Sequence, residues 1–178
     1  VQASYASVLW GAWLQAVGPV LIVLFAFALV HLAEATMRLA GWMTFFGATV
    51  LMMVSLIEIT FYISALYVNP PVMTSISFEL IYAVQHLYFV IAAPALFVPL
   101  GTVLLSSKIL PRIFGYLALV VGAVFAVMGI VSLLTLTLPA KITGLGGVQA
   151  LWWLAAAITL VVRSGKISGS GLARNDIV

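Results

Sequence analysis

The sequence predicts an all-α polytopic transmembrane helix bundle of about five spans. Of 178 residues, 65% are hydrophobic and only 6% are charged, and the mean hydropathy is +1.30, which is far outside the composition of a soluble domain. The apolar runs are long and unbroken, as in residues 20–30, whereas strands of a membrane barrel would be short and alternating. Because the bilayer core satisfies no backbone hydrogen bonds, such runs are expected to be helical.

Each predicted span contains the roughly 20 apolar residues that cross a hydrocarbon core of about 30 Å. The spans are expected at residues 8–31, 41–68, 77–105, 113–138 and 147–163. Helix-breaking residues separate them, namely Gly41, the run Asn69-Pro70-Pro71, Pro111 and Pro139. Residues 164–178 are polar and rich in glycine, so we expect a flexible tail there. Because the chain begins at Val1, an upstream signal peptide or a sixth helix is compatible with it.

Basic residues are concentrated at one side of the predicted bundle. Six fall on that side and Lys141 alone falls on the other; the six are Arg38, Lys108, Arg112, Arg163, Lys166 and Arg174. Since positive charge favours the cytoplasmic side, this side and the C-terminus are expected in the cytoplasm. The net charge of +3 is too small for a nucleic-acid surface, so we expect no nucleic-acid partner. The absence of cysteine excludes disulfides, thiolate metal ligands and cysteine nucleophiles.

The fourth span contains small residues at helical spacing, which are Gly115, Ala118, Gly122, Ala126 and Gly129. Such a stripe lets a second helix approach closely. We expect the partner to be another helix of the same chain, with an oligomer interface as the alternative.

Tryptophans and prolines give two further expectations about the spans. Trp10, Trp13, Trp152 and Trp153 on the outer side and Trp42 on the inner side are typical of an aromatic belt at the membrane interfaces. Pro19 in the first span, and Pro94 and Pro99 in the third, remove backbone hydrogen bonds and are expected to kink their helices.

The candidate functional residues are the polar side chains within the apolar spans. Glu58 lies well inside the second span, where a charged group costs roughly 2.5 to 3.5 kcal/mol at the bilayer centre. Ser55, Glu58 and Tyr62 share one helix face, and Glu79, Tyr82 and His86 repeat that spacing on the antiparallel third span. We expect these two faces to meet. At about 1.5 Å per residue, the outer half also contains Gln15, Ser132, Thr135 and Gln149.

We therefore predict a polar pocket that opens toward the outside, with Glu58 and His86 at its floor. A histidine and a carboxylate in such a site can share a proton, act as acid and base, or hold a hydrogen-bonding ligand. The alternative is a hydrogen-bonded pair that only fixes helix register. We expect no metal and no cofactor, because the chain has two histidines and no metal-ligand spacing on one helix face.

A second cluster, His31, Glu34 and Arg38, lies at the inner end of the first span. Glu34 and Arg38 are expected to form an i, i+4 helix pair that is worth a few tenths of a kcal/mol. We interpret the cluster as a solvated helix end, with a cytoplasmic contact or gate as the alternative.

The segment Ser106 to Gly122 has a basic loop, then Leu110-Pro111-Arg112, then a helix punctuated by glycine. It resembles a segment of uncharacterised bacterial multi-pass membrane proteins that have a domain-of-unknown-function label. The resemblance implies a six-helix protein of the bacterial inner membrane and implies no activity.

Three functions are compatible with these features. The first is an integral membrane protein that binds or moves a small amphipathic or lipid-like ligand in the outer-half pocket. The second is an accessory subunit of a larger membrane complex, which would contact a membrane-protein partner or further copies of itself. The third is a membrane-embedded enzyme that uses Glu58 and His86 as acid and base.

Overall fold

The computed structural model describes the backbone of residues 2–67, 71–135 and 139–172, and the side chains of residues 10–65, 75–134 and 144–163. Every element within these ranges is a helix. In chain order they are α1 (Gln2–Leu32), α2 (Leu39–Tyr67), α3 (Pro71–Leu87), the π-helical segment η1 (Tyr88–Ala92), α4 (Ala93–Ser106), α5 (Arg112–Thr135) and α6 (Pro139–Leu172).

The predicted fold class is confirmed, because five stretches are long and apolar enough to cross a membrane. They are Trp10–Leu32, Leu39–Ala65, Ser75–Ser106, Arg112–Leu134 and Gly144–Arg163. The third stretch combines α3, η1 and α4 in one continuous helix. Beyond the fifth stretch, α6 continues as far as Leu172, so the segment predicted as a flexible tail begins as helix. Residues 173–178 lie outside the described residues.

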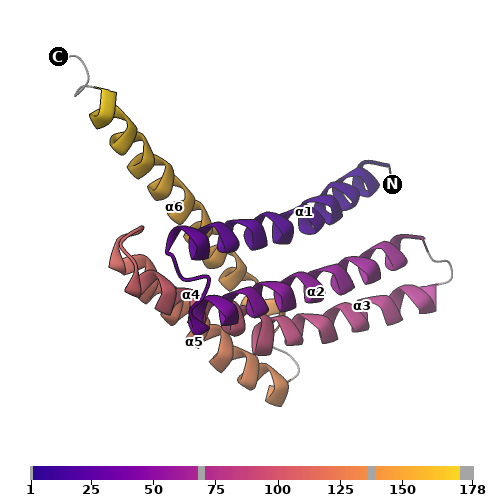
Figure 1. Ribbon diagram of the computed structural model, residues 1–178. Coiled ribbons are helices and arrows are strands. Elements are labelled where there is room, and N and C mark those ends of the chain that lie inside the picture. Colours follow the sequence, from indigo (N-terminus) through magenta and orange to yellow (C-terminus); the bar gives the residue numbers. More distant parts are fainter. Residues whose placement is uncertain (1, 68–70, 136–138, 173–178) are drawn as a thin grey trace.

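The helices are packed around α4. Figure 1 shows α1, α2 and α3 running side by side, and α6 running at a steep angle to them with its C-terminal half projecting from the bundle. Within the described part, α4 packs most extensively against α5 and next against α2. The consequence is a buried centre on α4, where Leu96, Phe97, Leu100 and Leu104 are fully enclosed.

Aromatic rings fill the space between α4, α5 and α6. Phe97 lies 5.4 Å from the rings of both Trp152 and Trp153, and Phe125 stacks on Phe89 at 5.7 Å. Both tryptophans are buried, and the indole N–H of Trp152 donates to the Phe114 carbonyl at 3.2 Å. The aromatic-belt prediction is therefore wrong for Trp152 and Trp153, because their rings face the helices of the bundle. Trp10, Trp13 and Trp42 are exposed.

Glycines set the contact between α4 and α5. A Cβ on Gly101 would lie 2.9 Å from the carbonyl oxygen of Gly115, and one on Gly115 would lie 3.0 Å from that of Gly101. Further along α5, Cβ atoms on Gly122 and Gly129 would lie 2.8 Å from atoms of α4 and η1. The predicted stripe is therefore confirmed as packing within the chain, since small residues let the two backbones approach.

The third span changes its helical pitch just before Pro94. The N–H of Ala93 donates to the carbonyl of Tyr88, five residues earlier, which is the hydrogen bond of a π-helix. Pro94 has no N–H, and in an ordinary α-helix its ring would collide with the carbonyl four residues earlier. The wider π-turn relieves that collision. At Pro94, where a kink was expected, the structure therefore shows a local change in helical pitch.

Candidate functional site

Glu58 is buried on α2, and its partner is a residue of the neighbouring helix. The side-chain amide of Gln85 on α3 donates to Glu58 Oε1 at 2.9 Å. Ser55, one turn away on α2, is also buried, and Tyr62 is half-buried. The predicted face of α2 therefore does turn into the bundle. Gln85 was not among the predicted residues, although its place next to His86 on a polar helix was a signal for it.

The predicted face of α3 is rotated away from Glu58. Glu79 and Tyr82 are exposed, while Ile81 and Val84 are buried. His86 is half-buried, and its Nδ1 donates to the Tyr82 carbonyl at 2.7 Å. Its buried Nε2 has no hydrogen-bond partner among the described residues. The structure therefore brings Glu58 together with Gln85, and His86 satisfies its Nδ1 within its own helix.

Other polar groups of the predicted outer half also pair within the bundle. The hydroxyl of Tyr88, in η1, donates to the side-chain oxygen of buried Gln149 on α6. Buried Ser132 donates to the Gly129 carbonyl at 2.8 Å. Gln15 is half-buried on α1, and the side chain of Thr135 lies outside the described residues. The Tyr88 to Gln149 bond links η1 to α6, whereas the Ser132 bond lies within α5. Together with Glu58 and Gln85, these groups form a polar layer in this half of the protein.

In the second predicted cluster, His31 lies at the end of α1, whereas Glu34 and Arg38 lie in the turn between α1 and α2. Because α1 ends at Leu32 and α2 begins at Leu39, the predicted i, i+4 helix pair of Glu34 and Arg38 is wrong. Glu34 has a φ of 51°, the left-handed conformation that often follows a helix end and that glycine adopts most easily. The N–H of Ala35 then donates to the Val30 carbonyl at 3.0 Å. His31, Glu34 and Arg38 are all exposed.

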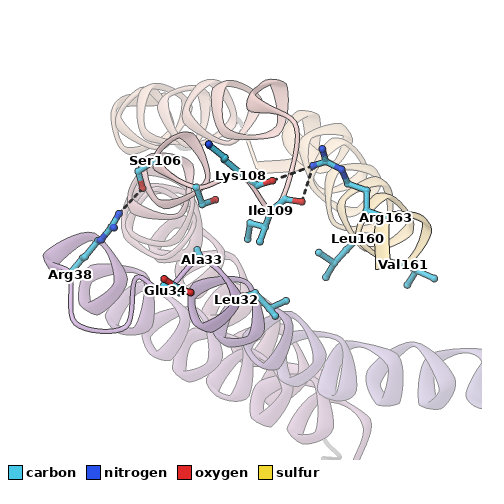
Figure 2. A pocket seen from close by; sticks show the side chains of 11 residues that line it. Leu32, Ala33, Glu34, Arg38, Ser106, Lys108, Ile109, Leu160, Val161 and Arg163 are labelled. Carbon is cyan, nitrogen blue, oxygen red and sulfur yellow. Dashed lines mark hydrogen bonds between the residues drawn. The ribbon is translucent and has the colours of Figure 1, made fainter. Parts of the chain in front are cut away.

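This turn forms one side of a pocket, which we call the basic pocket. Its volume is about 930 Å³, and it lies between the end of α1, the turn before α2, the α4–α5 loop and α6. It is lined by Leu32, Ala33, Glu34, Arg38, Ser106, Ser107, Lys108, Ile109, Leu160, Val161 and Arg163. Figure 2 shows Arg38 and Arg163 on opposite sides, with Leu32, Ile109 and Leu160 between them.

The basic pocket combines positive charge with an apolar wall. Arg38, Lys108 and Arg163 contribute three cations from three different segments, and Glu34 contributes one carboxylate. Arg38 donates to the Ser106 hydroxyl at 3.4 Å, which ties the first turn to the end of α4. Arg163 Nη1 donates to the Ile109 carbonyl at 3.0 Å and approaches that of Lys108 at 3.5 Å. Since a guanidinium has five N–H donors, Arg163 can hold the loop and still bind an anion.

A second pocket of about 500 Å³, which we call the α2–α4 groove, lies next to Arg38. It is lined by Leu39, Ala40, Met43, Pro94, Ala95, Val98, Pro99 and Thr102. Among the described lining residues, the one side chain with a hydrogen-bonding group is Thr102, whose hydroxyl donates to the Pro99 carbonyl at 2.7 Å. Neither this groove nor the basic pocket includes Glu58 or His86 in its lining.

Comparison with protein families, with characterised proteins and with solved structures finds no match to this chain. Among the described residues, no group of three or more His, Cys, Asp or Glu side chains is arranged to hold a metal ion. The function is therefore argued from the chemistry of the two pockets and of the polar layer.

Proposed function

We propose that this integral membrane protein binds a small amphipathic or lipid-like molecule with an anionic head group in the basic pocket. The observation that supports this function is the position of three cationic side chains, Arg38, Lys108 and Arg163, around one apolar-walled pocket at a helix end. An amphipathic ligand would place its anionic group among the cations and its apolar part against Leu32, Ile109 and Leu160.

The size and chemistry of the pocket support this class of ligand. Small-molecule sites usually have volumes of about 300 to 1,000 Å³, and the basic pocket has about 930 Å³. Arginine binds phosphate and carboxylate groups through two parallel hydrogen bonds. Basic pockets at the cytoplasmic ends of transmembrane helices are typical sites for anionic lipid head groups.

Because positive charge favours the cytoplasmic side of a membrane, we place the end of the bundle with the basic pocket, and the end of α6, on the cytoplasmic side. The resemblance of residues 106–122 to bacterial multi-pass proteins makes the bacterial inner membrane the proposed location. The proposed site is thus on the side of the membrane opposite to the outer-half pocket that the sequence predicts.

The outer-half cluster favours a different role. Because Glu58 is paired with Gln85, and Tyr88 with Gln149, these groups support the alternative in which polar pairs fix the register of the helices. Ligand binding by Glu58, His86, Tyr62, Tyr82, Ser55, Gln15 and Glu79 stays a prediction.

Binding of anionic lipid to charge-neutralised variants tests the proposed function. The side chain of Lys108 makes no hydrogen bond or ion pair with any residue that the structure describes, so Lys108→Gln removes charge without breaking a described contact. Arg112→Gln is the matched control, because Arg112 is exposed at the same end but outside the pocket lining. The affinity of the purified protein is measured from the rise in melting temperature with added phosphatidylglycerol, and again with phosphatidylcholine.

We expect phosphatidylglycerol to bind more tightly than phosphatidylcholine. Lys108→Gln should lower its affinity about tenfold, because a hydrogen bond to a charged group contributes about 1.5 to 3 kcal/mol, and Arg112→Gln should leave it unchanged. Equal affinity for the two lipids, or equal losses in the two variants, would reduce the site to general surface charge and overturn the proposal.

A further inference from the structure

We propose that the α2–α4 groove binds an acyl chain of an anionic phospholipid whose head group is held at the rim of the basic pocket. The inference rests on the proposed function and names its ligand class more closely. It also assigns a second, apolar subsite that the charged residues alone do not indicate.

The linings of the two pockets adjoin at the start of α2 and at the end of α4. Arg38 lines the basic pocket, and the next two residues, Leu39 and Ala40, line the groove. On the facing helix, Ser106 lines the basic pocket and Thr102, one turn earlier, lines the groove. The hydrogen bond from Arg38 to Ser106, at 3.4 Å, therefore stands at the boundary between a cationic surface and an apolar one.

The groove extends from this boundary toward the middle of the membrane. Ser106 ends the third membrane-crossing stretch, and the groove follows α4 from Thr102 back to Pro94. At 1.5 Å per residue, this segment covers about 12 Å of helix. A ligand with its charge at Arg38 would thus have its apolar part directed into the bilayer, which is the orientation of an acyl chain below a phosphate.

The walls of the groove are shaped by proline, alanine and a close approach of backbones. Pro94 and Pro99 lie on α4, and their rings take the place of longer side chains, while Ala40 and Ala95 leave space between the helices. Just beyond, a Cβ on Gly47 would collide with the backbone of Ala95, so α2 and α4 are in contact at that point. The α2–α4 groove therefore lies between two helices that are in direct contact next to it.

Hydrogen-bonding ligands do not suit this recess. The Thr102 hydroxyl is turned back onto the Pro99 carbonyl at 2.7 Å, and the other lining side chains are apolar. An apolar groove of about 500 Å³ can by itself hold the acyl chain of any lipid. The adjacent Arg38 supplies the charge that selects a tail attached to an anionic head group.

Photo-crosslinking tests the inference on the full chain in phosphatidylcholine nanodiscs. A small fraction of phosphatidylglycerol has a photoactivatable diazirine in one acyl chain, and the crosslinked residues are mapped by mass spectrometry. The same probe with a phosphatidylcholine head group is the comparison. Thr102→Phe fills the groove from an exposed position, and Val120→Phe, at an exposed position on α5, is the matched control.

We expect crosslinks of the phosphatidylglycerol probe to concentrate on Met43, Ala95 and Val98, at least threefold above the exposed face of α5. Thr102→Phe should reduce them severalfold, Val120→Phe should not, and the phosphatidylcholine probe should show no concentration. An even distribution of crosslinks over the bundle, or no effect of Thr102→Phe, overturns the acyl-chain site. The proposed function still holds in that case if Lys108→Gln weakens the binding of phosphatidylglycerol. Loss of the head-group selectivity, with crosslinks still in the groove of both probes, instead overturns the proposed function.

Discussion

Single polar residues in the spans have different roles that depend on what each side chain faces. Glu58 is buried and accepts a hydrogen bond from Gln85, whereas Glu79 and Tyr82 are exposed on the same helix pair. The spacing of Glu79, Tyr82 and His86 correctly indicates one face of a helix, but it does not indicate which face turns inward. That rotation depends on apolar residues, because Ile81 and Val84 pack into the core.

The Glu58 to Gln85 hydrogen bond can be measured with a double-mutant cycle. We expect Glu58→Leu and Gln85→Leu to show a coupling free energy of about 1 kcal/mol, because interhelical hydrogen bonds in membranes are worth about 0.6 to 1.7 kcal/mol. Gln85→Leu alone should destabilise the protein, since it leaves a buried carboxyl group without its donor. The free energy of unfolding is measured by denaturation in mixed micelles. Tyr82→Phe, at an exposed position of α3, is the control, and additive effects of the two leucine substitutions would contradict the contact.

At the scale of the element, the contact of α5 with the third span depends on the positions of the glycines on α5. Gly129 lies against the π-helical segment, and a Cβ there would be 2.8 Å from the backbone of Phe89 and Val90. Backbone atoms cannot move aside as a side-chain end can. The π-turn before Pro94 and the glycine on α5 are therefore complementary features of one interface.

Gly129→Ala should destabilise the protein by about 1 to 3 kcal/mol, because it overpacks this interface. Gly146→Ala on α6 is the matched control, since nothing lies within 4 Å of its added methyl group. Alanine favours a helix over glycine by up to about 1 kcal/mol at either position, so the difference between the variants reports packing. Thermal unfolding in detergent measures both. A Gly129→Ala variant as stable as Gly146→Ala would show that the close approach is absent.

At the scale of the whole molecule, the charge asymmetry and the helix count together predict how the protein lies in the membrane. The turn between α1 and α2 and the α4–α5 loop both contribute to the basic pocket, so these two connections lie at the same end of the bundle. Because α2 crosses the bundle, its C-terminal end and the start of α3 lie at the opposite end. The absence of cysteine makes this arrangement directly testable with single introduced thiols.

We expect a membrane-impermeant maleimide to label Ser75→Cys in intact cells and to label Met37→Cys only after the membrane is permeabilised. Met37 is 88% exposed in the turn before α2, and Ser75 is exposed at the start of the third membrane-crossing stretch. The native chain is the control, because it has no thiol to react. The reverse pattern of labelling would place the basic pocket outside, and labelling of both positions in intact cells would contradict a spanning topology.

The sequence by itself determined the fold class, the five spans and the small-residue contact, because each depends on local composition or on spacing along one helix. Apolar length decides where a chain crosses a bilayer, and glycines repeated every three or four residues mark where another helix can approach. Only the tertiary structure decided that Glu58 meets Gln85, that Trp152 and Trp153 face the core, and that Arg38, Lys108 and Arg163 surround one pocket. These outcomes depend on helix rotation and on the packing of segments far apart in the chain, which spacing along one helix does not encode.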